Sequence, residues 1–228
     1  MRRIAILTGA GISKESGIAT FRDDDGLWRN YRFQDMATPE AWHRDPALVT
    51  EFYNMRRKNV IESEPNPGHL SLVDLEQKYQ VDIITQNVDD LHERAGSSHI
   101  LHLHGEIRKV RSSLDENLIY EVDGWEVNIG DCCELGSQLR PHIVWFGEPV
   151  PMIIEAGRIA RQADIFIVIG TSLMVYPAAG LLYEVNPAIP KYLIDPEAIP
   201  AYGVENLEII RATASVGVPQ LVKRLLDT

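Results

Sequence analysis

The sequence predicts an α/β protein whose core is a mainly parallel sheet with helices on both faces. Short apolar runs such as 165–169 recur along the chain, and segments with helical spacing of apolar residues separate them. Glycines and polar residues follow several of these runs directly, as they do where the strands of a parallel sheet end. A chain of 228 residues that is 45% hydrophobic is long enough for one compact domain spanning 1–228.

Charge and cysteine content exclude several classes of protein. The 22 Lys and Arg residues against 33 Asp and Glu residues give a net charge of -11, which would repel nucleic acid. No apolar run approaches the ~18 residues of a membrane span. The charge therefore argues against nucleic acid as a partner, and the lack of such a run argues against a membrane. The chain starts without the pattern of a signal peptide, and its two cysteines, Cys132 and Cys133, are adjacent. A reducing, cytoplasmic location is therefore expected.

The expected elements follow from apolar spacing and from the residues that interrupt it. Apolar residues three or four apart predict one amphipathic helix over 40–62, and another helix follows the breaker at 65–68. A polar stretch over 112–138 with little periodicity predicts a small surface insertion. The other expected elements are strands at 4–7, 81–85, 100–103, 143–146, 165–169, 192–194 and 207–210, and helices at 153–162, 178–185 and 218–226.

A glycine-rich loop follows the first predicted strand. Gly9 and Gly11 carry no side chain that would keep the backbone amides away from a pyrophosphate. The usual dinucleotide fingerprint has a third glycine where this chain has Lys14, and the next glycine is Gly17. Taken alone, the loop fits either a phosphate site or an ordinary tight turn.

Polar side chains also follow two other predicted strands. Gln86, Asn87 and Asp89 come directly after 81–85, where an amide pair and a carboxylate can bind ribose hydroxyls or a carboxamide. The alternative is a loop in which Asp89 or Asp90 caps the next helix. The segment 170–172 (GTS) after 165–169 raises the same choice. Because the carboxyl ends of parallel strands meet in one crevice, the three loops together favour a shared ligand site.

One histidine has the setting of a general base. His104 stands at the end of the strand predicted at 100–103 and is followed by Gly-Glu. An imidazole there can accept a proton near neutral pH. His102 lies two residues earlier and is expected on the same face, so periodicity does not separate the two. The other five histidines are interpreted as packing or surface residues.

Short blocks of distinctive sequence span most of the chain. They are 9–13 (GAGIS), 16–18 (SGI), 20–22 (TFR), 85–89 (TQNVD), 104–106 (HGE), 140–148 (RPHIVWFGE) and 170–172 (GTS). Together and in this order they resemble the blocks of the sirtuins, a family of NAD-dependent protein-lysine deacylases. The resemblance implies a Rossmann-like sheet with a helical insertion at about 33–66 and a small module at about 107–140.

The resemblance also implies a reaction that consumes NAD. In it the acyl-lysine oxygen attacks the nicotinamide-bearing ribose carbon, nicotinamide leaves, and an alkylimidate forms. His104 is then the general base that deprotonates a ribose hydroxyl for attack on the imidate carbon. Water completes the transfer, which gives free lysine and an O-acyl-ADP-ribose.

Site residues are carried over from the family position by position. Asn87 and Asp89 are expected at the nicotinamide and its ribose, and either Ile194 or Asp195 at the adenosine ribose. The whole NAD set is Gly9, Ala10, Gly11, Ser13, Gly17, Thr20, Phe21, Arg22, Trp28, Gln86, Asn87, Val88, Asp89, Gly170, Thr171, Ser172, Asp195 and Ala214. An acyl-lysine protein or peptide is expected to pair as a β-strand beside Val144, Phe146, Gly147 and Glu148.

A second pattern concerns the acyl group. Tyr53 and Arg56 are three apart on a predicted helix, and 52–56 (FYNMR) resembles the subgroup that removes succinyl, malonyl or glutaryl groups. A guanidinium can bind the distal carboxylate in a bidentate manner, and the tyrosine hydroxyl can donate a further hydrogen bond. Spacing alone favours the alternative of a core tyrosine next to a solvated arginine. Phe33 stands where such members often have a smaller residue, and the larger phenylalanine would narrow the acyl pocket.

The chain departs from the family at the zinc position. Many sirtuins bind a structural zinc ion through two pairs of cysteines, whereas 110–113 (VRSS) replaces the first pair here. Only Cys132 and Cys133 remain near the second pair, and two adjacent thiolates do not make the usual site. We expect a module without metal that is held by packing of Leu118, Tyr120, Trp125 and Val127.

The expected function is NAD-dependent deacylation of lysine, with succinyl and malonyl groups removed as well as acetyl. A plain deacetylase, a mono-ADP-ribosyltransferase and a non-catalytic NAD-binding sensor are the alternatives. His104 argues against the sensor, because a protein that only binds NAD does not need a general base. The sequence leaves the oligomeric state open.

Overall fold

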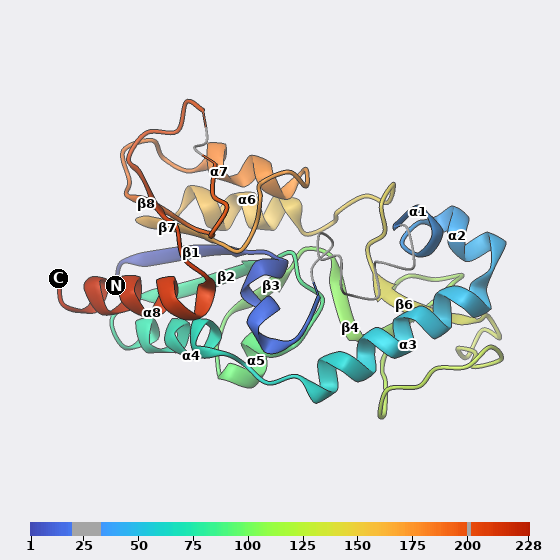
Figure 1. Cartoon of the computed structure of the whole chain (residues 1–228). Helices are drawn as coiled ribbons and strands as arrows, with labels where there is room; N and C mark the ends of the chain where they lie inside the picture. The colour runs from blue at the N-terminus through green and yellow to red at the C-terminus, as the bar shows by residue number, and fades with distance from the viewer. Residues whose placement is uncertain (20–32, 200–201) are drawn as a thin grey trace.

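A six-stranded parallel sheet forms the centre of the computed structural model, which describes residues 1–19, 33–199 and 202–228 (Figure 1). The strand order is β3-β2-β1-β7-β8-β9, and every neighbouring pair is parallel. The predicted α/β class is therefore confirmed. The strands are β1 (Arg3–Thr8), β2 (Gln80–Thr85), β3 (Ile100–His102), β7 (Ile165–Ile169), β8 (Lys191–Ile194) and β9 (Leu207–Ile210).

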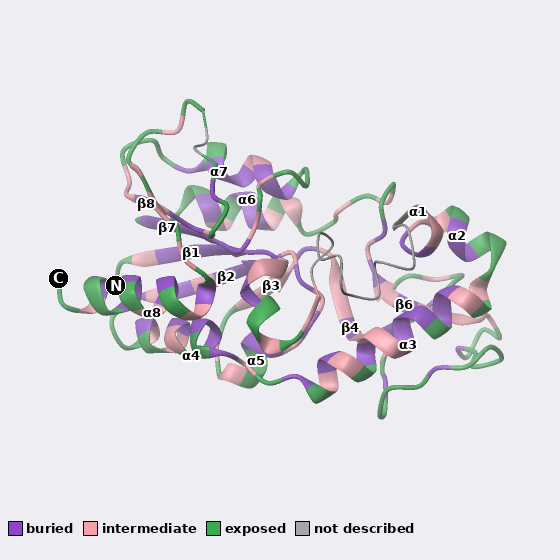
Figure 2. Cartoon of the chain, viewed as in Figure 1, coloured by how far each residue is buried: buried purple, intermediate pink, exposed green. Residues whose placement is uncertain are grey.

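Helices cover both faces of this sheet because successive strand residues point to opposite sides. Ile4 and Ile6 of β1 pack in one buried cluster, and Ala5 and Leu7 pack in another. The buried strands lie between the two helical layers in Figure 2. The first cluster includes residues of α4 (Pro67–Asp74), η4 (Leu75–Gln77) and α8 (Ala214–Leu226). The second includes residues of α6 (Ile153–Arg161), η5 (Ala178–Gly180) and α7 (Leu181–Glu184).

A second lobe lies beside the sheet and combines helices with a small antiparallel sheet (Figure 1). Its helices are α1 (Phe33–Met36), α2 (Pro39–Arg44) and α3 (Pro46–Glu62). Its strands, in the order β5-β4-β6, are β4 (Gly105–Ser112), β5 (Ile119–Glu121) and β6 (Leu139–Ile143). A buried cluster that includes Phe52, Ile107 and Trp145 joins these helices to this sheet.

The prediction of one helix over 40–62 is wrong, because the chain forms two helices that meet at Asp45. Thr38 caps α2 by accepting a hydrogen bond from the Ala41 amide at 3.1 Å. The Asp45 carboxylate caps α3 by accepting one from the Leu48 amide at 2.9 Å, and Pro46 occupies the first helical position. A capping side chain before a proline is a start signal that outweighs continuous apolar spacing.

Three other predicted elements differ from the structure in type or by more than one residue. The strand expected at 143–146 is wrong: β6 ends at Ile143 and belongs to the small sheet. The helix expected from 218 begins four residues earlier, at Ala214. The sequence did not indicate this start, because Gly217 and Pro219 weaken the helical pattern of the first turns. The helix expected at 178–185 is a short 3-10 turn followed by α7. Among the described residues, no helix is both long enough and apolar enough to cross a bilayer.

The small module has an apolar centre of its own. Val110, Val122 and Val127 are buried together, and Tyr120 packs against them. The expected packing of Tyr120 and Val127 is thus confirmed, whereas Leu118 is not part of this cluster. Trp125 is 38% exposed, with the Lys58 ammonium 5.3 Å from its ring centroid. A cation over an exposed indole replaces the core position that we expected.

Candidate active site

The glycine loop after β1 packs directly against the end of β7. The Gly9 amide donates to the Ile169 carbonyl at 2.9 Å, and the Gly11 amide donates to the Gly170 carbonyl at 2.8 Å. A Cβ atom on Gly9 would lie 2.7 Å from Cβ of Thr171, and one on Gly11 would lie 2.7 Å from Cα of Gly170. The two glycines are therefore required for the contact between the loops. This contact brings the predicted segments 9–13 and 170–172 together.

The loop after β2 contributes a buried polar network. The Asn87 amide group donates to the Gly9 carbonyl at 3.2 Å and to Ser13 Oγ at 3.1 Å. Ser13 in turn donates to Asp89 Oδ2 at 3.0 Å. Asp89 Oδ1 also accepts from the Leu91 amide at 3.2 Å, at the start of α5 (Leu91–Ala95). Asp89 therefore accepts the first backbone N–H of α5, as in the capping alternative, and it is also joined to the glycine loop through Ser13.

The charge of Asp89 depends on these hydrogen bonds. Its side chain is only 4% exposed, and burial raises the pKa of its carboxyl group. Hydrogen bonds from Leu91 and Ser13 favour the ionised form and oppose that rise in pKa. Asn87 uses only its nitrogen in these contacts, and its Oδ1 atom accepts no hydrogen bond within the described part of the chain.

His104 is fixed in the form that a general base requires. Its Nδ1 atom lies 2.9 Å from the Gln86 carbonyl oxygen, which can only accept, so Nδ1 bears the hydrogen. The lone pair is then on Nε2, which makes no hydrogen bond to any residue that the structure describes. Burial lowers the pKa of His104 below 6.5, so the ring is neutral at pH 7.

The residues around His104 hold it at the boundary between the two lobes. Gly105 has φ +83°, and a Cβ atom there would lie 2.1 Å from the His142 carbonyl oxygen. The Val144 amide donates to the His104 carbonyl at 2.9 Å. The glycine after His104 is thus required for the chain to turn from the main sheet into β4.

The structure separates His102 from His104, which periodicity did not. His102 Nε2 lies 2.7 Å from Glu93 Oε1, and Nδ1 lies 3.2 Å from the Asn87 carbonyl oxygen. Both ring nitrogens are therefore engaged, and no lone pair is left to accept a substrate proton. His104 is the better candidate for the base.

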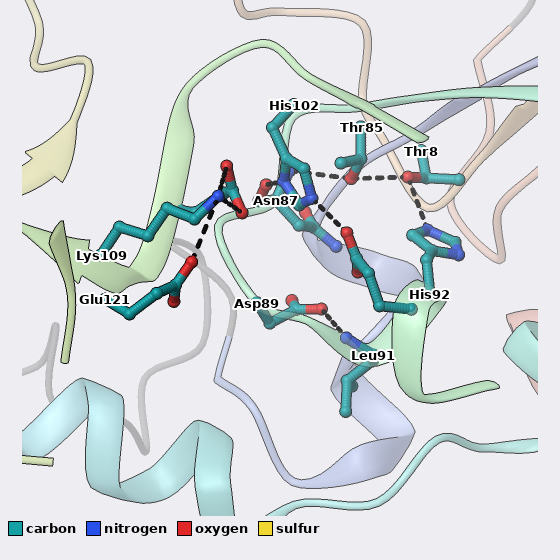
Figure 3. A network of polar contacts seen from close by, with 11 residues as sticks. Thr8, Thr85, Asn87, Asp89, Leu91, His92, His102, Lys109 and Glu121 are labelled. Atoms are coloured by element: carbon teal, nitrogen blue, oxygen red, sulfur yellow. Dashed lines mark hydrogen bonds and ion pairs between the residues drawn. The ribbon is translucent and has the colours of Figure 1, made fainter. Parts of the chain in front are cut away.

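Beneath the site lies a histidine pair that sequence reasoning assigned only to packing or the surface. Thr8 and Thr85 end neighbouring strands in register, and Thr8 donates to Thr85 across 2.8 Å (Figure 3). His92 Nε2 lies 3.1 Å from Thr8 Oγ1, and the His69 ring centroid is 5.0 Å from that of His92. Burial lowers the pKa of both rings, that of His69 to about 4. In the sequence, the only indication of this buried polar contact was that a threonine ends each of the two predicted strands, Thr8 after 4–7 and Thr85 in 81–85.

The candidate acyl site lies on α3, where Tyr53 and Arg56 are neighbours. Tyr53 is 1% exposed, and its hydroxyl accepts a hydrogen bond from Nε1 of Trp145 at 2.9 Å. The Arg56 guanidinium carbon is 5.7 Å from the Tyr53 ring centroid. Burial lowers the pKa of Arg56, while its hydrogen bond with Tyr53 and the charge of Asp89 oppose that shift. Tyr53 is therefore buried, and Arg56 beside it is half-buried and close enough to Asp89 for that charge to favour the ionised guanidinium.

Glu148 anchors the turn that follows β6. Its carboxylate accepts from Arg140 at 2.8 Å and from the Trp145 amide at 2.8 Å, and Arg111 approaches to 3.4 Å. The Arg140 guanidinium lies 3.4 Å from the Trp145 ring centroid. Gly147 turns with φ +90°, and Phe146 next to it is 41% exposed. The segment 144–148, predicted to lie beside the substrate peptide, is therefore a turn that the contacts of Glu148 hold in place.

The remaining predicted residues are placed as follows. Thr20, Phe21, Arg22 and Trp28 lie outside the described residues. Ile194 is buried in the core, whereas Asp195 follows β8 and accepts from the Glu197 amide at 2.8 Å. Ala10, Gly17, Val88 and Ser172 lie in the strand-end loops, and Ala214 is buried at the start of α8.

The residues at the zinc position do not fit a four-coordinate zinc site. Cys133 Sγ lies 3.4 Å from the Ser112 hydroxyl and 3.3 Å from the Ser137 hydroxyl, and Cys132 is exposed. Across residues 1–19, 33–199 and 202–228, no group of three His, Cys, Asp or Glu side chains is arranged to hold a metal ion. The Cys133 thiol and the two serine hydroxyls form a hydrogen-bonded cluster, whereas a structural zinc ion needs four ligands.

The parallel sheet and the loops that follow β1, β2 and β7 are typical of nucleotide-binding α/β proteins, and His104 is hydrogen-bonded to the β2 loop. The sequence matches the Sir2 family over residues 9–177. This chain belongs to that family, the sirtuins, as the sequence blocks predicted.

Relatives match over nearly the whole chain. An NAD-dependent protein deacylase of Bacteroides thetaiotaomicron is 53% identical over 99% of this chain and 99% of its own. One of Helicobacter pylori is 50% identical over 100% of this chain and 99% of its own.

Solved structures of Sir2 proteins share the fold. A Sir2 homologue in complex with NAD is 39% identical, has a TM-score of 0.90, and matches 99% of this chain and 90% of its own. A Sir2 variant with a deacetylated p53 peptide and 3'-O-acetyl ADP ribose is 28% identical, has a TM-score of 0.81, and matches 99% and 93%.

Proposed function

We propose that this chain is an NAD-dependent protein-lysine deacylase that removes succinyl and malonyl groups as well as acetyl. Its family and the names of its relatives support the general activity. The observation that carries the proposal is the neutral His104, whose Nε2 lone pair is directed away from its Gln86 anchor. In this proposal residues 1–228 act as one catalytic domain, with the insertion at about 33–66 and the module at about 107–140 on the substrate side.

The strand-end loops fit NAD chemically. The Asn87 Oδ1 atom and the Asp89 carboxylate are acceptors that match the carboxamide and hydroxyl donors of a nicotinamide riboside. Asn87 is held by two hydrogen bonds through its nitrogen, so its oxygen is directed and available. NAD, when bound, supplies an electrophilic ribose carbon and the hydroxyl that receives the acyl group. In the same scheme Asp195, which follows β8, binds the adenosine ribose.

The chain's part in the chemistry is proton transfer and positioning. His104 accepts a ribose hydroxyl proton at Nε2, and its Nδ1–H donates to Gln86 throughout. This donor bond favours the charged ring that forms during the transfer. The turn with Val144, Phe146 and Gly147 presents the acyl-lysine peptide next to His104, because the Val144 amide is bonded to the His104 carbonyl.

Tyr53 and Arg56 supply the preference for acidic acyl groups. Burial raises the pKa of Tyr53, so its hydroxyl stays protonated at neutral pH and can donate. A carboxylate four or five bonds beyond the lysine amide can accept from this hydroxyl and from the guanidinium together. An acetyl group has no such acceptor and gains nothing from the pair. The Phe33 side chain, expected to narrow this pocket, lies outside what the structure describes.

Nicotinamide release with acetyl-lysine and succinyl-lysine peptides of one sequence tests the proposal. Arg56→Met should lower kcat/KM for the succinyl peptide about 10- to 100-fold, the range for losing a charge-assisted hydrogen bond, and spare acetyl turnover. Arg44→Met, which removes an exposed arginine paired with Asp35, is the control. If the wild type and Arg56→Met both turn over the acetyl and succinyl peptides equally, the protein is a plain deacetylase. Label transferred from NAD to protein would instead indicate ADP-ribosyl transfer.

A further inference from the structure

Both ring nitrogens of His102 lie within hydrogen-bond distance of an acceptor. Nδ1 lies 3.2 Å from the Asn87 carbonyl oxygen and Nε2 lies 2.7 Å from Glu93 Oε1 (Figure 3). A carbonyl has no hydrogen to give, and an ionised carboxylate has none either. A neutral imidazole has a single N–H and satisfies only one of these acceptors. The geometry is that of an imidazolium, and the side chain is only 10% exposed.

We propose that His102 is a positioning residue that acts as an imidazolium and ties the Asn87–Asp89 loop to Glu93 of α5. The same ring thereby restrains the residue whose side chain holds Ser13 and Gly9. His104 bonds the preceding carbonyl, that of Gln86. Two histidines thus hold two consecutive carbonyls, one as a neutral base and the other as a cation.

The charges around His102 favour this form. The acidic groups that line the same cavity are Asp89 and Asp90 of the loop, Glu93 of α5, Glu106 of β4 and Glu121 of β5. The basic ones are Arg108 and Lys109 of β4, and Lys109 pairs with Glu106 at 2.9 Å and with Glu121 at 3.6 Å. His92 of α5 is close but buried in its neutral form. Glu93 and Glu106 raise the pKa of His102 above 6.5 in spite of its burial.

The positive charge also acts on Asp89. Burial raises the pKa of Asp89, and the His102 charge opposes that rise. Loss of the proton from His102 therefore weakens the loop in two ways, by removing a donor from the Asn87 carbonyl and by favouring protonation of Asp89. The consequence for NAD binding rests on the proposed function, whereas the charge state of His102 does not.

The charge state can be measured directly in the full chain. Nitrogen-15 NMR of the histidine rings distinguishes an imidazolium from either neutral tautomer, and spectra of His102→Asn assign the signal. We expect both His102 nitrogens to be protonated at pH 7 and to titrate above 6.5. A neutral His102 ring at pH 7 would overturn the proposal, whatever the activity of the enzyme.

Two substitutions separate the two hydrogen bonds. Asn places a donor near the position of Nδ1 and Gln places one near that of Nε2, so His102→Asn retains the Asn87 bond and His102→Gln retains the Glu93 bond. By calorimetry with NAD at pH 7, we expect His102→Gln to raise Kd about tenfold, and His102→Asn to raise it less. Wild-type affinity should fall at alkaline pH, and the affinity of His102→Asn should lack that fall. His99→Asn, at an exposed histidine, is the control.

The outcomes distinguish the inference from the proposed function. An imidazolium with the expected order of NAD affinities, but without deacylation, would reject the function and keep the role of His102. Unchanged NAD affinity in His102→Gln, or an alkaline fall that persists in His102→Asn, would reject the positioning role. A wild-type chain that binds no NAD would reject that role as well.

Discussion

The indole nitrogen of Trp145 donates a hydrogen bond to the Tyr53 hydroxyl at 2.9 Å, and both side chains are buried. This bond joins α3 to the turn after β6. Because the Tyr53 oxygen accepts from Trp145, its own hydrogen is free to point to another acceptor. The Arg140 guanidinium stacked on the Trp145 ring extends the connection to Glu148. The acyl side and the peptide side of the candidate site are therefore one packed unit.

Trp145→Phe should weaken binding of acidic acyl groups specifically. The ring remains as a surface for Arg140, but Tyr53 loses a donor, so we expect KM for a succinyl peptide to rise about fivefold. KM for the matched acetyl peptide should not change, and steady-state kinetics on both peptides measures the difference. Trp42→Phe is the control, because Trp42 lies 5.9 Å from Trp145 in the same cluster.

A double substitution tests whether Trp145 acts through Tyr53. If it does, adding Trp145→Phe to Tyr53→Phe should have no further effect on succinyl KM, because the accepting oxygen is already absent. Additive losses would show instead that Trp145 supports the pocket by packing alone.

Catalysis by His104 should persist below pH 6.5. A general base works only when neutral, and burial lowers the pKa of His104, so protonation becomes inhibitory only at more acidic pH than for a free histidine. The pH profile of kcat/KM on an acetyl peptide should show this acid limb. His104→Ala should lower kcat by about 100-fold or more while NAD still binds. Unchanged turnover in that variant would remove His104 from the mechanism.

Metal chelation should leave the small module folded. Cys133 is hydrogen-bonded to Ser112 and Ser137, and the buried Val110, Val122 and Val127 supply the packing. We therefore expect the same Tm with and without a strong chelator, and no zinc in the purified protein by elemental analysis. A Tm that falls by several degrees on chelation would show that a metal contributes to stability.

The core of the fold was predictable because local patterns determine it, whereas the site was only partly so. The apolar run of β7 and the glycines that follow β1 identify strands and loops from neighbouring residues. The roles proposed for His102 and His104 depend on a carboxylate from α5 and on which carbonyl oxygen of the β2 loop each ring contacts. The Tyr53–Trp145 bond joins residues 92 positions apart, and periodicity carries no information about such contacts.

Acid should destabilise the protein through His69, which is completely buried. Its pKa is about 4 in the folded chain, because burial disfavours the charged ring, and about 6.5 when unfolded. Between these values the unfolded chain binds more protons, so this contribution is complete above pH 6.5 and is lost as pH falls towards 4. Linkage gives a loss of about 2 kcal/mol between pH 7.5 and pH 5 from this histidine alone.

His69→Asn isolates that contribution. The backbone N–H of Asn66 donates to His69 Nδ1, and an asparagine oxygen near the same position can accept that hydrogen bond without titrating. Urea unfolding at pH 7.5 and pH 5 should show a drop in free energy that is about 2 kcal/mol smaller in His69→Asn than in the wild type. His99→Asn, at an exposed histidine, should keep the wild-type drop. An equal drop in all three proteins would mean that His69 is not neutralised by burial.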